Sequence, residues 1–274
     1  MFVTQRRLFL RRLTVRGALL GAGGMASPVQ AQPADADSMQ IRRFQLADSY
    51  LRAGQTDRAI SLLEDLYADS PSTYAFYSKL KEAYESVKRY DDAIALVEDR
   101  LAQNRTAVRI SEKARLIYLS GDEEAAFTTW DEALATAPDQ ATTYRIVYQA
   151  LVDARRFERA IEVLQRGREQ LSRPDEFRIQ VAYLYSLTGQ HTDAIDEYLS
   201  LLADSERRLG FVRSRLNTFI QQDDALTASI EGVEAAVRAA PMNLAYRELL
   251  AWLYMESEDY RAAFDVYRAI DRLR

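Results

Sequence analysis

One spacing constrains this chain more than any other feature. An alanine recurs at Ala59, Ala93, Ala126, Ala160 and Ala194, with steps of 34, 33, 34 and 34 residues between them. Apolar residues around each alanine follow the three- and four-residue spacing of a helix face. A fixed period of this length indicates a stack of repeated units instead of one globular core.

Each unit reads as two helices joined by a turn. In the first unit Gly54 closes one helix and Pro71 stops the next, and Gly121 takes the same place as Gly54 in the third unit. Lys88 and Arg155 stand at this turn in the second and fourth units. A non-glycine residue in a left-handed turn costs about 1 kcal/mol. We therefore expect the joint at Lys88 to be weaker or differently shaped.

The pattern of small and large residues resembles the tetratricopeptide repeat, a helix-turn-helix unit of about 34 residues. The resemblance implies an all-α, right-handed α-solenoid of about seven stacked repeats over residues 40–274. The pattern fades in the sixth unit, where Ser229 replaces the alanine and Asp224 the glycine. The expected repeats are 40–73, 74–106, 107–140, 141–174, 175–207, 208–242 and 243–274.

Residues 1–31 have the composition of an export signal peptide. They hold five arginines and no acidic residue, and a small-x-small ending precedes a cleavage point near Ala31. Arg6 and Arg7, followed by Leu-Phe-Leu-Arg, resemble the twin-arginine export motif, although Gln5 stands where that motif prefers Ser or Thr. A general Sec signal is the alternative route. We expect a periplasmic or otherwise extracytoplasmic mature protein.

An uncleaved membrane anchor is the weaker alternative for the same segment. Its apolar run, residues 17–29, is 13 residues long, short of the roughly 20 that a bilayer-spanning helix needs. We expect no integral membrane segment in the mature chain. Residues 32–39 are short and polar, which predicts a flexible leader before the first repeat.

Charge and composition exclude several classes of function. Of 36 basic and 41 acidic residues, five basic ones lie in residues 1–31, which leaves 31 basic against 41 acidic, a net charge of −10. This balance repels phosphate backbones, so we expect no nucleic-acid partner. The chain has no cysteine, which excludes disulfides and thiolate chemistry.

No catalytic, cofactor-binding or metal-binding residue can be named from the sequence. His191 is the single histidine, which makes a poor metal site without cysteines, and we expect it to pack or to contact solvent in the turn of the fifth repeat. The acidic pairs, such as Glu123 and Glu124, fall near the starts of second helices, where carboxylates favour the helix dipole. We therefore expect no cofactor and no enzymatic activity.

The resemblance implies a non-enzymatic scaffold that holds a protein or peptide in a cell-envelope assembly. Two alternatives stay open. The repeats could recruit substrate for an enzyme whose catalytic domain lies on another chain or in a missing C-terminal part. They could also bind cell-wall glycan, which would need aromatic side chains exposed along one surface.

In the tetratricopeptide family the first helix of each repeat lines the concave side. Carrying the groove-facing positions of the family onto this sequence gives Ser111, Arg115, Tyr118, Arg145, Gln149, Val152, Ile179 and Tyr183. Arg115 and Arg145 fall on neighbouring first helices, about 8–10 Å apart by helix packing, and could share one anionic group of a partner. The alternative is that both arginines are solvated or pair with local acids.

The equivalent positions of the first two repeats are Phe44, Asp48, Glu82 and Glu85. They lack the Lys and Asn pattern of the family's chaperone-tail carboxylate clamps, so that class of partner is not expected. The last repeat ends in its second helix, whose Phe264, Val266 and Tyr267 have no obvious cover. This predicts self-association through the C-terminal repeat or a longer natural product.

Overall fold

The computed structural model describes residues 33–222 and 224–273, and these are helical without strands. The predicted signal peptide lies outside the described residues. The helices are α1 Pro33–Arg52, α2 Thr56–Asp69, α3 Tyr74–Ser86, α4 Tyr90–Gln103, α5 Ala107–Ser120, α6 Glu123–Ala135, α7 Ala141–Asp153, α8 Phe157–Leu171, α9 Arg178–Leu187, α10 His191–Asp204, the 3-10 turn η1 Glu206–Arg208, α11 Leu209–Leu216, α12 Ala225–Ala239, α13 Leu244–Glu256 and α14 Tyr260–Asp271.

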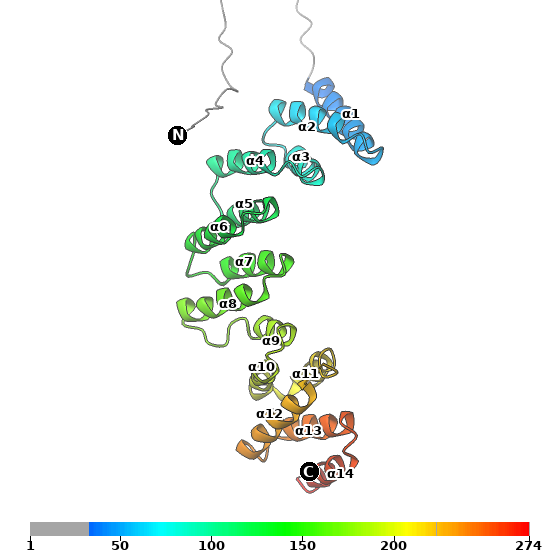
Figure 1. Cartoon of the computed structure of the whole chain (residues 1–274), viewed down its shortest axis with the longest axis vertical. Helices are drawn as coiled ribbons and strands as arrows, with labels where there is room; N and C mark the ends of the chain where they lie inside the picture. The colour runs from blue at the N-terminus through cyan, green and yellow to red at the C-terminus, as the bar shows by residue number, and fades with distance from the viewer. Residues whose placement is uncertain (1–32, 223, 274) are drawn as a thin grey trace, which may run out of the picture.

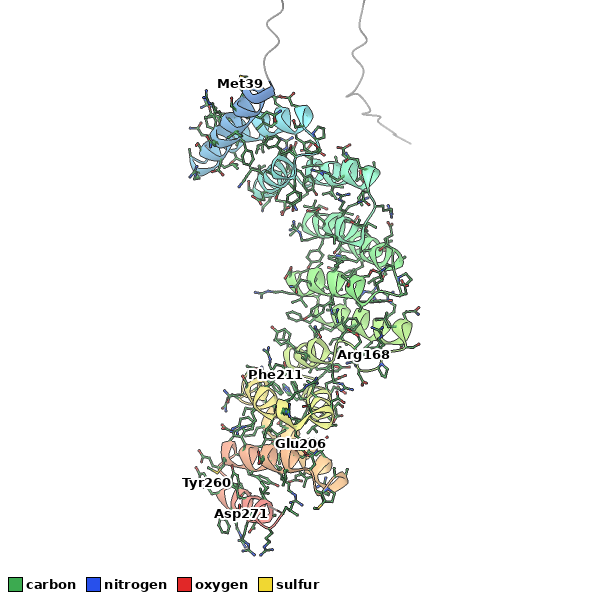
Figure 2. The ribbon with its side chains drawn as sticks, turned by 180° about the vertical axis from the view of Figure 1, so that it is seen from behind. Met39, Arg168, Glu206, Phe211, Tyr260 and Asp271 are labelled. Carbon is green, nitrogen blue, oxygen red and sulfur yellow. The ribbon has the colours of Figure 1, made fainter. Side chains whose placement is uncertain are left out.

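The helices form a single elongated stack of antiparallel pairs, one pair in each predicted repeat (Figure 1). The odd-numbered helices, called the first helices, lie along one side of the stack, and the second helices α2 to α12 lie along the other, with α14 beyond α13 at the end. The stack is curved, with its open side on the first helices (Figures 1 and 2). The expected all-α solenoid of repeats is confirmed.

The start of the first repeat differs from the expectation. Residues 33–39, predicted as part of a flexible leader, are the first two turns of α1. Proline is favoured at the first position of a helix because its missing N–H would have no intrahelical partner there. Alanine, which occurs twice in this stretch, is also a strong helix former. The same short polar sequence therefore begins the helix.

The recurring alanines lie where paired helices come closest. Each of the five is fully buried, and the equivalent Ala263 of the last repeat is 1% exposed. In the sixth repeat Ser229 is also fully buried, and its hydroxyl donates to the carbonyl of Ala225 at 2.7 Å. This bond satisfies the buried hydroxyl, which explains how serine replaces alanine here. Only a small side chain fits where the backbones come within about 8–10 Å.

A residue with positive φ lies in the joint of every repeat; it closes the first helix in six of them, and in the sixth it directly precedes α12. The residues are Gly54, Lys88, Gly121, Arg155, Gly189, Asp224 and Glu258, with φ between 57° and 101°. The joint at Lys88 is not differently shaped: the N–H of Arg89 donates to the carbonyl of Tyr84, as that of Gln55 does to Tyr50. The repeat imposes one turn geometry, so the non-glycine joints retain the strain of a left-handed residue.

The sixth pair is the irregular one. α11 has only eight residues, and α12 packs against α10 and α13. Phe219, after α11, is 2% exposed, with its ring 5.7 Å from His191 and 6.4 Å from Tyr198. α10 and α12 come so close that a Cβ on Gly232 would lie 2.9 Å from Ile195 Cγ2.

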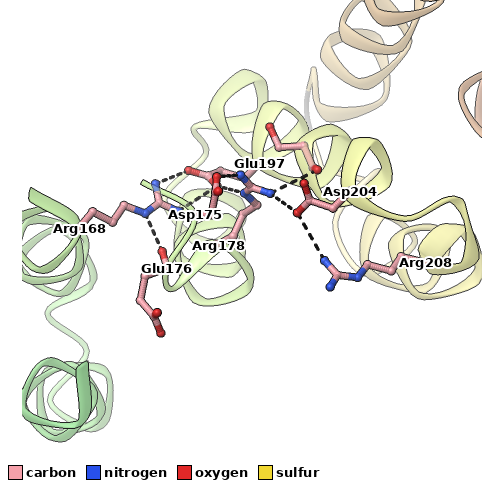
Figure 3. A network of polar contacts seen from close by, with 8 residues as sticks. Arg168, Asp175, Glu176, Arg178, Glu197, Asp204 and Arg208 are labelled. Atoms are coloured by element: carbon pink, nitrogen blue, oxygen red, sulfur yellow. Dashed lines mark hydrogen bonds and ion pairs between the residues drawn. The ribbon is translucent and has the colours of Figure 1, made fainter. Parts of the chain in front are cut away.

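A network of ion pairs, half-buried at Arg168, Arg178 and Glu197 and exposed at its edges, joins the fourth, fifth and sixth repeats (Figure 3). Arg168 of α8 donates to both carboxylate oxygens of Glu197 on α10, at 2.6 and 3.0 Å. Arg178 of α9 reaches Asp204 at 2.6 Å and also pairs with Asp175. Bidentate arginine–carboxylate pairs fix relative orientation as well as distance. The network therefore sets how these helices stack.

Candidate functional site

The strongest candidate site is a hollow of about 350 Å³ on the open side of the stack. We call it the α3–α5–α7 hollow, because three successive first helices supply most of its wall. One second helix, α4, contributes a single residue, Arg100. The exposed side chains of Tyr74 and Val108 provide apolar surface.

Two of the cations in this hollow are already neutralised. Lys81 pairs with Glu112, and the hydroxyl of Tyr77 donates to the same carboxylate at 2.6 Å. Burial, and then this hydrogen bond, raise the pKa of Tyr77 well above its ordinary value. Arg115 Nη2 lies 2.6 Å from Glu85 Oε1. These pairs form part of the wall and are not free to take a ligand's charge.

The two remaining arginines have no carboxylate partner in the described part of the chain. Arg100 is 8% exposed, and its Nε and Nη2 lack hydrogen-bond partners there. Its guanidinium lies 4.8 Å from the ring centre of Tyr77 and 6.0 Å from that of Tyr67. Arg109 donates through Nη1 to the carbonyls of Asn104, at 2.7 Å, and Arg100, at 3.3 Å. The lining holds one further acid, Asp153, so its four cations outnumber its two carboxylates and the hollow carries an excess of positive charge.

Three predicted groove residues line this hollow: Ser111, Arg115 and Gln149. Ser111 is 4% exposed, and its hydroxyl accepts a hydrogen bond from Trp130 Nε1 at 3.1 Å. Gln149 is exposed, and its amide donates to Asp153 at 2.9 Å. The register of the first helices thus brings these positions together, although Ser111 serves mainly to satisfy the buried indole.

Arg145 and Ile179 lie at a second hollow, formed around the α8–α9 loop. Arg145 pairs with Glu176 and lies 5.3 Å from the ring centre of Phe177. Arg115 and Arg145 therefore line different hollows, and each already has a carboxylate. The alternative in which both pair with local acids describes the structure, and joint capture of one anion is not supported.

The other three predicted residues lie at neither hollow. Tyr118 is packed: its hydroxyl donates to the carbonyl of Ala154 at 3.4 Å, and Arg156 lies 5.3 Å from its ring centre. Val152 is half-buried. Tyr183 is 40% exposed and, with Ile179 at 43%, leaves apolar surface on α9.

Arg100 is the functional candidate that the groove positions missed, because it lies on a second helix. A signal for it does exist in the sequence. Seven residues after each small residue of the second helices, the equivalent positions are Leu66, Arg100, Ala133, Gly167, Leu201, Ala236 and Ile270. Arg100 is the one charged member of an otherwise apolar column.

The described residues offer no evident site for metal chemistry. Among residues 33–222 and 224–273, no group of three or more carboxylate or histidine side chains could hold a metal ion. His191 begins α10 and stacks on Phe219, and its Nδ1 is buried without a hydrogen-bond partner in this part of the chain. None of the described helices is long and apolar enough to span a bilayer.

A family model described as "Tetratricopeptide repeat" matches residues 50–116. The matched segment runs from the end of α1 into α5 and includes Arg100, Arg109 and Arg115. The tetratricopeptide resemblance is thus supported for this segment. No curated protein matches the sequence.

Several solved structures are similar to the chain. A tetratricopeptide repeat protein from Parabacteroides merdae is 12% identical, covering 85% of this chain and 93% of that one, with a TM-score of 0.40. PilF of Pseudomonas aeruginosa is 17% identical, covering 79% of this chain and 99% of that one, with a TM-score of 0.38. MamA of Desulfovibrio magneticus is 15% identical, covering 60% of this chain and 93% of that one, with a TM-score of 0.36. Likeness at this level carries no inference about function.

Proposed function

We propose that the chain is a non-enzymatic scaffold that holds a protein partner on the open side of its helix stack. The observation that carries this proposal is the α3–α5–α7 hollow, which is built by three consecutive first helices. Stacked repeats create extended concave surfaces of the kind that bind peptides and folded proteins. The apolar side chains and uncompensated positive charge here suit a polypeptide segment that carries both apolar and acidic groups.

We further propose that this scaffold acts outside the cytoplasm, in a cell-envelope assembly. The support is sequence alone: five arginines without an acid in residues 1–31, the motif around Arg6 and Arg7, and the small-residue ending at Ala31. Replacing both arginines, Arg6→Lys with Arg7→Lys, should stop export if the twin-arginine route is used. Unchanged export of this variant would contradict the twin-arginine route and favour a general Sec signal. A full-length cytoplasmic product of the unmodified gene would contradict the proposed localisation.

The partner can be sought directly. The full chain, carrying an affinity tag, would be expressed in its own host and recovered with its bound proteins from the envelope fraction. We expect a protein that binds in a fixed ratio and survives washing. A recovered enzyme with a catalytic domain would favour the recruiting-arm alternative. A purified chain that binds cell-wall glycan and no protein would contradict the proposal.

A further inference from the structure

The buried position of Arg100 lowers the stability of the fold. Its side chain is nine-tenths buried, and two of its three nitrogens have no hydrogen-bond partner in the described residues. A buried charge without a paired acid destabilises a protein strongly. The faces of Tyr77 and Tyr67 offset part of this cost through cation–π attraction. Nε and Nη2 still have no acceptor among the described residues.

Packing alone gives no reason for an arginine here. The equivalent positions in the other six repeats hold Leu, Ala, Gly or Ile, and four of these, Leu66, Ala133, Leu201 and Ile270, are at most 4% exposed. Replacing buried ionic groups by apolar ones of similar volume is often neutral or stabilising. The guanidinium thus has the features of a group held ready for an incoming acceptor.

The surroundings indicate which acceptor. Lys81 and Arg115 pair with Glu112 and Glu85, whereas Arg100 and Arg109 form no ion pair with a described acid, and the lining's remaining carboxylate, Asp153, accepts from Gln149. Planar guanidinium groups match the two oxygens of a carboxylate. The exposed side chains of Tyr74 and Val108 beside them suit an apolar neighbour of that carboxylate.

We propose that the α3–α5–α7 hollow binds a carboxylate of an acidic, partly apolar segment of the protein partner, through Arg100 with Arg109 as the second cation. This inference rests on the proposed function. It differs from the sequence-derived site in its residues, because the receiving charge comes from a second helix in the wall and not from Arg115 and Arg145.

The test uses purified full chain and two synthetic peptides of alternating Leu and Glu or Leu and Gln, both blocked at their ends. Binding is followed by calorimetry and by tryptophan fluorescence in a Trp252→Phe background, in which Trp130, whose indole donates to Ser111 in the hollow wall, is the remaining tryptophan. We expect the Glu peptide to bind and the Gln peptide to bind much more weakly. Arg100→Met should lower the affinity for the Glu peptide about tenfold to a hundredfold, as expected for the loss of a hydrogen bond to a charged group.

The matched control is Lys113→Met, which removes one positive charge from α5 at a residue that pairs with Glu98 and does not line the hollow. It should bind the Glu peptide nearly as wild type does. Arg100→Met should also melt at or above the wild-type temperature. Equal affinity of Arg100→Met and Lys113→Met for the Glu peptide would overturn the inference and leave Arg100 a structural residue.

If Arg100→Met does not fold, the comparison moves to the wild-type chain and Arg109→Gln. Equal binding of the Glu and Gln peptides to the wild type, or undiminished binding by Arg109→Gln, would then refute the carboxylate site. These measurements are independent of the envelope-fraction experiment. A partner that is captured equally well by Arg100→Met would keep the scaffold function and remove only this site.

Discussion

Gly167 offers the sharpest test of how the helices pack. It lies within α8, and a Cβ built on it would meet Phe177 Cε2, Tyr144 Cδ1 and Tyr144 Cγ, all at 2.9 Å. Both rings are held firmly. Phe177 and Tyr144 are 3% and 2% exposed, and the Tyr144 hydroxyl donates to the carbonyl of Pro138 at 2.9 Å. Gly167→Ala would therefore force rigid groups apart.

Two opposing effects set the magnitude. Alanine in place of glycine inside a helix stabilises it by about 0.5–1 kcal/mol. Overpacking of a tight core costs about 1–3 kcal/mol, and contact with three ring atoms places this site in the upper part of that range. We expect Gly167→Ala to lower the free energy of unfolding by roughly 1–2 kcal/mol, the difference between these terms.

Gly210→Ala is the matched control. Gly210 is exposed in α11, and a Cβ there meets nothing within 4 Å, so this change should not destabilise the chain. Both variants would be unfolded in urea, with fluorescence and circular dichroism as separate probes because a repeat array need not unfold in one step. If Gly167→Ala is as stable as Gly210→Ala at an unchanged urea dependence, the packing described for α8 is wrong.

Four further outcomes are expected. Ala126→Leu should overpack α5 against α6 and lower the free energy of unfolding by about 1–3 kcal/mol, whereas the same change at the exposed Ala68 should lower it little. Equal melting temperatures of the two variants would contradict the assignment of the recurring alanines to the contact between paired helices. Arg155→Gly should raise the free energy of unfolding by up to about 1 kcal/mol, because it relieves a left-handed residue with φ of 57°, and a lower melting temperature would argue against strain at this joint. Burial, and then its hydrogen bond to Glu234, raise the pKa of Tyr254 from 10.0 to about 12. The stability that this shift contributes is complete below pH 10 and is lost as the pH rises toward 12. Tyr254→Phe should therefore flatten the alkaline decline in stability, and an unchanged decline would refute the raised pKa of Tyr254. Finally, α14 exposes Phe264 and Tyr260, each at 61%, and Figure 2 labels Tyr260. Self-association through this face should appear in sedimentation and be weakened by Phe264→Ser, whereas a monomer at high concentration would contradict the prediction.

Short-range patterns in the sequence were enough to predict the architecture. Burial of the alanines follows from a period near 34 residues combined with helical spacing, since a recurring small residue marks the closest approach of paired helices. The left-handed turns at Lys88 and Arg155 were predictable for the same reason, because every joint of the array must turn through the same geometry. The start of α1 was not predicted, because the polar residues after Gln32 suit a loop and a first helical turn equally well.

The site depended on contacts that no local pattern contains. Arg115 pairs with Glu85, 30 residues away, and Arg145 with Glu176, 31 residues away, so whether these charges are free depends on how one repeat is turned on the next. The sequence did show that Arg100 breaks an apolar column. Only the tertiary structure shows that Arg100 lies against two tyrosine rings, lines a hollow and forms no ion pair with a described acid. Burial and pairing depend on side chains that distant helices bring together, so no local pattern in the sequence reveals them.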